Sequence, residues 1–188
     1  RQVSLLARLE LAGVDVGERW QALAPWLQKR QADTVQPFLS LQYLYGLARA
    51  DKPEADLLLQ ALRIHAHTAP AFSRAVWAEV TLPLAEALLA HARGDYPRAA
   101  RLLAGSLPRL NEIGGSHAQR DLFAQIELDA RLQAGDWEVA QQTLELRRRY
   151  DSLDVPTNRS LARVYRKLEL PALARQAEDR VAQVLSAG

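Results

Sequence analysis

The amino-acid sequence predicts an all-α protein, arranged as a right-handed superhelix of antiparallel helix hairpins. Ala and Leu dominate the composition, whereas β-branched residues are scarce and form no alternating run. Apolar residues recur with a helical period between short turns, which is typical of adjacent antiparallel helices. A turn sequence that repeats along the chain indicates about five hairpins. We therefore expect residues 1–188 to form one domain of degenerate helical repeats.

The composition excludes several classes of protein. There is no cysteine, so disulfides, thiol nucleophiles and thiolate metal sites are excluded, and we expect a cytoplasmic protein without a cofactor. The net charge is +2, and acidic residues are interspersed among the arginines, so we expect no nucleic acid partner. No apolar run reaches the roughly 18 residues of a membrane span. The chain lacks methionine and begins at Arg1, which indicates a piece of a longer protein.

The apolar pattern of the first half of the chain predicts five helices. The first covers residues 3–12 and ends at Gly13, and the second reaches about Arg30 with Pro25 inside it. Asp15 and Glu18 have the spacing of a capping arrangement for that second helix. The third covers residues 38–50, the fourth runs from Pro53 through residue 67, and the fifth covers residues 72–93 with a kink at Pro83.

The second half continues the pattern. A helix over residues 96–112 bends near Pro108, and helices follow over residues 119–134 and 137–150. Two further helices, around residues 161–168 and 171–185, complete the chain. The four tryptophans fall on apolar helical faces, so we expect core positions for Trp20, Trp26, Trp77 and Trp137.

The turns between helices repeat one another. Gly94-Asp95-Tyr96-Pro97 aligns with Gly135-Asp136-Trp137-Glu138, and equivalent turns begin at Ala50 and Glu169. The first residues of these four turns are 44, 41 and 34 positions apart, and a weaker copy begins at Gly17. The glycine ends one helix with a positive φ, and an alanine five residues later lets the next helix approach closely. This is the physical design of a tetratricopeptide repeat.

Three runs carry a family resemblance: residues 9–20, residues 92–96 and residues 113–121. Together they resemble the tetratricopeptide repeat protein 38 family, over nearly the whole chain and corresponding to the C-terminal half of its members. The resemblance implies a repeat fold and brings no reaction with it. A Phe-x-Asp-x-His pattern of the family reads Phe38-Leu39-Ser40-Leu41-Gln42 here. If that pair carries a shared activity, this chain lacks it.

The run Gly114-Gly115-Ser116-His117-Ala118-Gln119-Arg120-Asp121 is the least ordinary stretch. Its glycines are suited to ending one helix, and Ser116 with Gln119 predicts a capping box for the next. A capping box requires neither His117, Arg120 nor Asp121. These three are therefore candidate binding residues, or part of a catalytic site completed by a missing N-terminal half.

Other polar groups have simpler explanations. His65 and His67 lie two apart on a helix without a third ligand nearby, so we expect no metal site. A basic concentration lies near the C-terminus, and a solvated face, an acidic peptide or phosphate partner, and nucleic acid remain alternatives for it. Its members are Arg147, Arg148, Arg149, Arg159, Arg163, Arg166 and Lys167.

The architecture favours a scaffold that binds a protein or peptide along a concave face. The first helices of the hairpins line that face, which makes Gln125, Asp129, His91 and Leu88 candidate partner-binding residues. An enzyme or small-ligand-binding protein that uses His117, Arg120 and Asp121 is the main alternative. Self-association is the third, because the end repeats of an array expose apolar surface.

Overall fold

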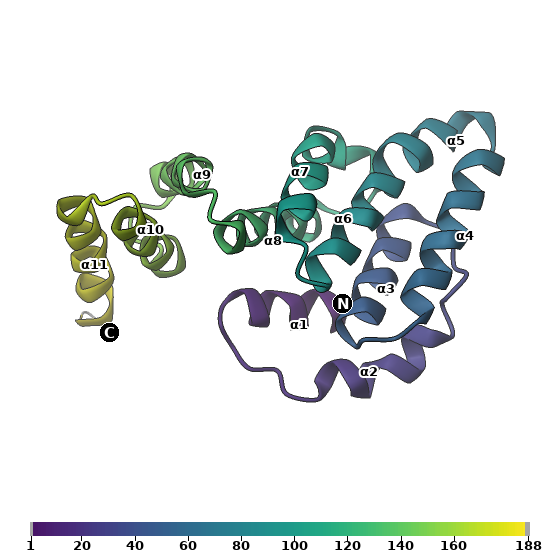
Figure 1. Cartoon of the computed structure of the whole chain (residues 1–188), viewed down its shortest axis with the longest axis horizontal. Helices are drawn as coiled ribbons and strands as arrows, with labels where there is room; N and C mark the ends of the chain where they lie inside the picture. Colours follow the sequence, from purple (N-terminus) through teal and green to yellow (C-terminus); the bar gives the residue numbers. More distant parts are fainter. Residues whose placement is uncertain (1, 187–188) are drawn as a thin grey trace. The chain divides into compact units, whose positions relative to one another are not determined.

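The computed structural model describes residues 2–186, which form helices and connecting loops without a β-strand (Figure 1). The prediction of an all-α protein is confirmed. The chain divides into two compact units, the first ending at Ala130 and the second beginning at Arg131.

The first unit is the N-terminal part of the chain, up to Ala130. Its elements are α1 (Gln2–Leu11), α2 (Arg19–Gln28), α3 (Pro37–Arg49), α4 (Glu54–Thr68), α5 (Ala71–Ala75), η1 (Val76–Thr81), α6 (Leu82–Ala92), α7 (Tyr96–Ser106), η2 (Leu107–Ile113) and most of α8 (His117–Ala134). The second unit holds the end of α8 together with α9 (Trp137–Tyr150), α10 (Val155–Lys167) and α11 (Pro171–Ser186).

Helix α3 is the centre of the first unit. Nine of its thirteen residues are buried, and it packs against α1, α2, α4 and α6. Gly46 makes this packing possible, because a Cβ at this position would lie 2.7 Å from a methyl group of Leu27 and 2.9 Å from one of Val3. The neighbouring helices therefore approach the backbone of α3 directly, which is the use that a helix interior makes of glycine.

The predicted fifth helix is a continuous run of three segments, α5, η1 and α6. Its middle segment, η1, is a π-helix that ends at Thr81. Helix α6 follows directly from Leu82, with Pro83 in its first turn. Proline lacks the N–H that a regular helix would use, and wide π turns are a common way to accommodate such a defect. The sequence predicted a kink at Pro83, and the structure places the irregularity in the turn before it.

Five helix ends share one hydrogen-bonding pattern. In each, one residue adopts a positive φ: Gly13 (+85°), Asp51 (+53°), Gly94 (+80°), Gly135 (+76°) and Glu169 (+58°). The N–H of the next residue then donates to the carbonyl five positions before it, over 2.8–3.0 Å. This is the six-residue cap that satisfies the last carbonyls of a helix.

These caps correct two details of the predicted repeat. The first turn is centred on Gly13 rather than on Gly17, and the second on Asp51 rather than on Ala50. The sequence alignment placed a small residue at each of these slots, but the positive φ falls on the residue just before the one whose amide completes the cap. Four of the predicted close-packing alanines are buried, namely Ala55, Ala99, Ala140 and Ala174, whereas Ala22 of the weaker copy is exposed.

Other predictions were wrong at the level of single side chains. Asp15 does not cap α2: its carboxylate accepts from the N–H of Gly17 at 2.8 Å, and Glu18 makes no side-chain cap. Trp26 is 47% exposed rather than buried, and its ring meets Tyr43 edge-on. Several large apolar residues in the predicted helices are exposed as well, namely Leu5, Leu57, Ile64, Phe72 and Leu146.

Candidate functional site

The Gly114–Asp121 run forms the connection from η2 into α8. Gly114 and Gly115 both have positive φ, +85° and +76°. A Cβ on Gly115 would lie 3.0 Å from the ring of Phe38, so the loop backbone packs directly against the start of α3. Ser116 and Gln119 exchange hydrogen bonds of 2.8 and 3.3 Å as a capping box. The predicted stop-and-cap chemistry is confirmed.

The remaining residues of this run are arranged as follows. Arg120 donates to the carbonyls of Gly114 and Gly115, which closes the loop on itself. Asp121 accepts from Gln125 at 2.6 Å and lies 3.5 Å from the guanidinium of Arg8 in α1. His117 is exposed, and the structure shows no hydrogen bond or ion pair between its imidazole and another described residue. The structure therefore does not bring His117 together with Arg120 or Asp121.

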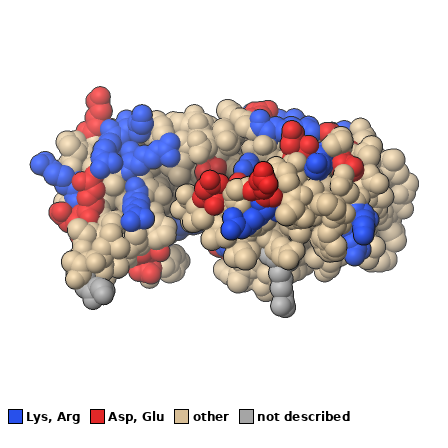
Figure 2. Space-filling view, turned by 90° about the horizontal axis from the view of Figure 1, so that it is seen from below, with Lys and Arg blue, Asp and Glu red and all other residues tan. Residues whose placement is uncertain are grey.

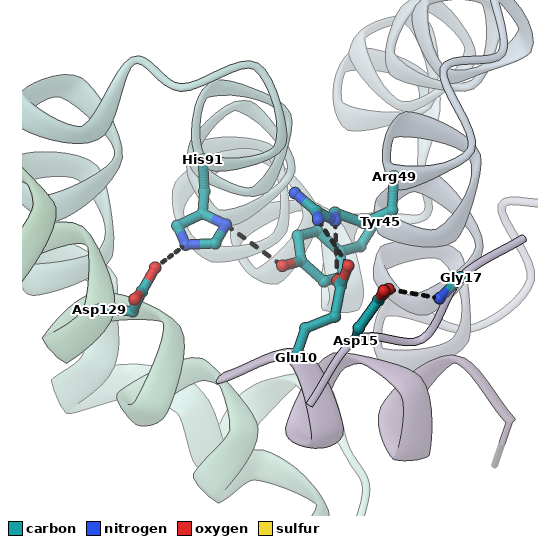
Figure 3. Close-up of polar contacts among 7 residues, drawn as sticks. All are labelled: Glu10, Asp15, Gly17, Tyr45, Arg49, His91 and Asp129. Atoms are coloured by element: carbon teal, nitrogen blue, oxygen red, sulfur yellow. Dashed lines mark hydrogen bonds and ion pairs between the residues drawn. The ribbon is translucent and has the colours of Figure 1, made fainter. Parts of the chain in front are cut away.

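A second polar group joins three helices in the interior of the first unit (Figure 3). His91 of α6 lies between Tyr45 of α3 and Asp129 of α8. Its Nε2 is 2.7 Å from the Asp129 carboxylate, and its Nδ1 is 3.2 Å from the Tyr45 hydroxyl. With Nε2–H donating to the carboxylate, Nδ1 accepts from the hydroxyl, so the two partners assign the tautomer.

Beside this chain, Arg49 of α3 makes a bidentate ion pair with Glu10 of α1, with distances of 2.8 and 3.1 Å (Figure 3). Burial raises the pKa of the Tyr45 phenol well above its ordinary value, with the guanidinium of Arg49 opposing that rise. A phenol held neutral in this way is a poor nucleophile. The geometry of Tyr45, His91 and Asp129 is thus suited to joining α3, α6 and α8 rather than to nucleophilic catalysis.

The predicted partner-binding residues differ in their accessibility. His91 and Leu88 are buried, at 5% and 1% exposure, and therefore hold the core of the first unit. Gln125 and Asp129 are half-buried on α8. His65 packs edge-on against Trp77, with ring centroids 4.5 Å apart, and His67 is exposed. Within residues 2–186, no group of three or more His, Asp or Glu side chains is placed to hold a metal ion.

The predicted basic concentration lies in the second unit. Figure 2 shows Lys and Arg side chains gathered on one face of that unit, whereas acidic and basic side chains lie side by side on the first. Helix α10 carries four cationic residues and no acidic one. Arg166 pairs with Glu178 of α11, and Arg148 of α9 pairs with Glu145. The side chains of Arg159, Arg163 and Lys167 are exposed and have no carboxylate partner among the described residues.

Sequence reasoning missed Tyr45, Arg49 and Glu10. Tyr45 looks like one more member of the apolar face of α3, and its hydroxyl acquires a role only when α6 packs beside it. Arg49 and Glu10 are 39 residues apart, in helices whose pairing no local pattern indicates. Acidic and basic residues at helix ends are common, so their presence alone carried no signal.

Comparison with known proteins adds no assignment. No protein-family model matches the chain, and no solved structure matches it either. Across residues 2–186, none of the helices has both the length and the apolar character needed to cross a bilayer.

Proposed function

We propose that this chain is a scaffold of tetratricopeptide-like helix hairpins that binds a protein or peptide partner. In this proposal the hairpins follow one another as a right-handed superhelix, as the sequence predicts. The observation that carries it is the recurrence of one cap at Gly13, Asp51, Gly94, Gly135 and Glu169. Repeated hairpins of this kind commonly present an extended binding surface, so the inference to function rests on architecture.

The polar residues on the first helices of the hairpins support the same proposal. Tyr45 of α3 contacts His91 of α6, and His91 in turn contacts Asp129 of α8. Neighbouring hairpins are therefore tied by specific hydrogen bonds in addition to apolar packing, and a rigid surface binds at a lower entropic cost. The resemblance to the tetratricopeptide repeat protein 38 family belongs to this proposal and supports a repeat fold.

The enzyme alternative has weaker support. It requires His117, Arg120 and Asp121 to act together, but Arg120 and Asp121 are engaged with backbone carbonyls, Arg8 and Gln125. His117 points to no partner among the described residues. The candidate residues for catalysis are thus mostly used in holding the loop and α8 in place.

Affinity capture tests the proposed function. The immobilised chain is exposed to cell extract, and each retained protein is then purified and titrated against the free chain. We expect at least one partner to bind saturably with a dissociation constant tighter than about 0.1 mM. A heat-denatured bait is the control for adhesion. Failure of every purified candidate to bind the native chain in titration would refute the scaffold proposal.

A further inference from the structure

The second unit carries three unpaired cations in a line. We propose that Arg159, Arg163 and Lys167, here called the basic row, bind an acidic peptide segment of a partner protein. This inference rests on the proposed scaffold function and assigns one surface and one chemistry to it. Everything it uses lies within α9, α10 and α11.

The charges of the basic row are available, in contrast to those of one cluster of arginines in the first unit. There, Arg63 and Arg98 both pair with Glu86, and Arg93 pairs with Asp56, around a single pocket. No described carboxylate lies within ion-pair distance of the basic row. Because an unpaired group of like charges is unfavourable in the free protein, an anionic partner relieves repulsion as it binds.

Two of the three cations are held in place. The guanidinium of Arg163 lies 5.7 Å from the ring centroid of Trp137, and the ammonium of Lys167 lies 5.8 Å from the same ring. Trp137 is the half-buried first residue of α9. Cation–π contacts of this kind restrict long side chains, which reduces the entropy that a ligand must remove.

The spacing of the basic row matches an extended peptide. Its members are four residues apart on a helix, so successive cations are about 6 Å apart along the axis. Alternate side chains of an extended chain point to one side and repeat every 6.6 Å or so. A segment with carboxylates at every second position therefore places one acid against each cation.

The surroundings favour a peptide over nucleic acid. The basic row spans only about 12 Å along α10, and carboxylates flank that helix in the chain, at Asp154 before it and Glu169 after it. Arg159 lines a pocket of about 310 Å³ together with the apolar Ala162 and Val181 and with the ion pair between Arg166 and Glu178. A peptide can supply an apolar side chain to this pocket, whereas a sugar–phosphate backbone cannot.

The indole N–H signals of the intact chain provide a test by nuclear magnetic resonance. The probe is an eight-residue peptide in which aspartates alternate with alanines, and its counterpart carries asparagines instead. We expect the aspartate peptide to shift the Trp137 indole signal, assigned by its loss in Trp137→Phe, and to leave those of Trp20, Trp26 and Trp77 unchanged. The asparagine peptide is expected to produce no shift.

Two variants with the same change in net charge decide the location. The variant R159Q/R163Q/K167Q is expected to bind the aspartate peptide at least about tenfold more weakly. The variant K29Q/R101Q/R175Q removes three exposed cations elsewhere and is expected to bind within about twofold of the parent. Circular dichroism confirms that both fold.

Three outcomes would overturn the assignment of this surface. They are equal binding by the two variants, absence of a Trp137 shift at saturating peptide, and tighter binding of an eight-nucleotide single-stranded DNA than of the aspartate peptide. A failure of the proposed scaffold function can be distinguished from a failure of the basic row. A captured partner that binds the parent and R159Q/R163Q/K167Q equally leaves that function standing and removes only the basic row.

Discussion

At the scale of single residues, the interior of the first unit depends on a few polar and conformational choices. Tyr45 supplies the hydroxyl that completes the hydrogen bonding of His91, and Gly115 supplies the backbone that packs against Phe38. Neither residue is prominent in the sequence, because a tyrosine in an apolar face and a glycine in a loop are both ordinary.

Removal of the Tyr45 hydroxyl tests the polar chain. Tyr45→Phe leaves the buried Nδ1 of His91 without its donor, so we expect the free energy of unfolding to fall by about 1–3 kcal/mol at pH 8. Urea denaturation measures this difference. Tyr150→Phe is the control, since Tyr150 is 88% exposed and its replacement is expected to change stability by less than about 0.5 kcal/mol.

Comparison of the parent with Tyr45→Phe also tests the raised pKa of Tyr45. In the unfolded chain tyrosine ionises near pH 10, whereas burial keeps Tyr45 protonated in the folded chain to higher pH. The stabilisation from this group is therefore complete below about pH 10 and decreases as pH rises above it. We expect the stability gap between parent and Tyr45→Phe to shrink by about 1 kcal/mol between pH 9 and 11. A constant gap would contradict the burial of this phenol.

Gly115 tests the contact between the loop and α3. Gly115→Ala adds a Cβ at φ +76° and 3.0 Å from the Phe38 ring, so we expect a loss of about 2–4 kcal/mol. Gly105→Ala is the matched control, because a Cβ there meets nothing within 4 Å in helix α7. That change is expected to stabilise the protein by about 0.5–1 kcal/mol. Thermal and urea unfolding show whether each substitution lowers or raises the free energy of unfolding.

At the scale of helices and turns, the sequence predicted the presence of the helices well and the exact positions of the turns less well. Helical periodicity and proline predicted nearly every helix, and the Ser116–Gln119 cap was correct. The turns at Asp51 and Gly13 were misplaced by one and four residues, because a cap depends on which amide reaches a distant carbonyl. The exposed Trp26 and Ile64 could not be predicted, since helical amphipathicity does not show which neighbour covers a face.

Glu169 tests the account of the repeated cap. It holds φ +58°, a conformation that costs an L-residue about 1–2 kcal/mol and costs glycine almost nothing. We therefore expect Glu169→Gly to raise the free energy of unfolding by about 0.5–1 kcal/mol. Glu138→Gly, at an exposed position within α9, is expected to lower it by a similar amount. Destabilisation by both substitutions would contradict the left-handed cap.

At the scale of the whole molecule, the two units differ in their cores. The first unit buries many large side chains around α3 and α6. In the second unit, the large buried apolar side chains are Leu144, Leu161, Val164 and Tyr165, and its other buried apolar residues are alanines. Less buried apolar area means less stabilisation per residue, so the two units are expected to open separately.

Native-state hydrogen exchange tests this difference. We expect the slowest amides of α10 and α11 to exchange through an opening that costs less free energy than the global unfolding reported by α3 and α6. Mass spectrometry of peptides from both units, at several denaturant concentrations, gives the two values. A single common free energy for the slowest amides of both units would show that the chain unfolds as one cooperative block.

The proposed binding surface could not be predicted to the same degree as the helices. The sequence indicated the basic concentration near the C-terminus, but it did not show that Arg166 and Arg148 are paired while Arg159, Arg163 and Lys167 are not. Arg166 is paired because α11 brings Glu178 to it, whereas Arg148 is paired within α9, with Glu145. The sequence gives the charged residues of a chain, but the folded structure determines which of them are paired and which can bind a partner.

Calorimetric titration of a purified, captured partner into the intact chain decides whether this chain binds another protein. We expect saturable binding with a dissociation constant tighter than about 0.1 mM. We also expect weaker binding by R159Q/R163Q/K167Q than by K29Q/R101Q/R175Q. Absence of saturable binding for every captured protein would contradict the proposed scaffold function.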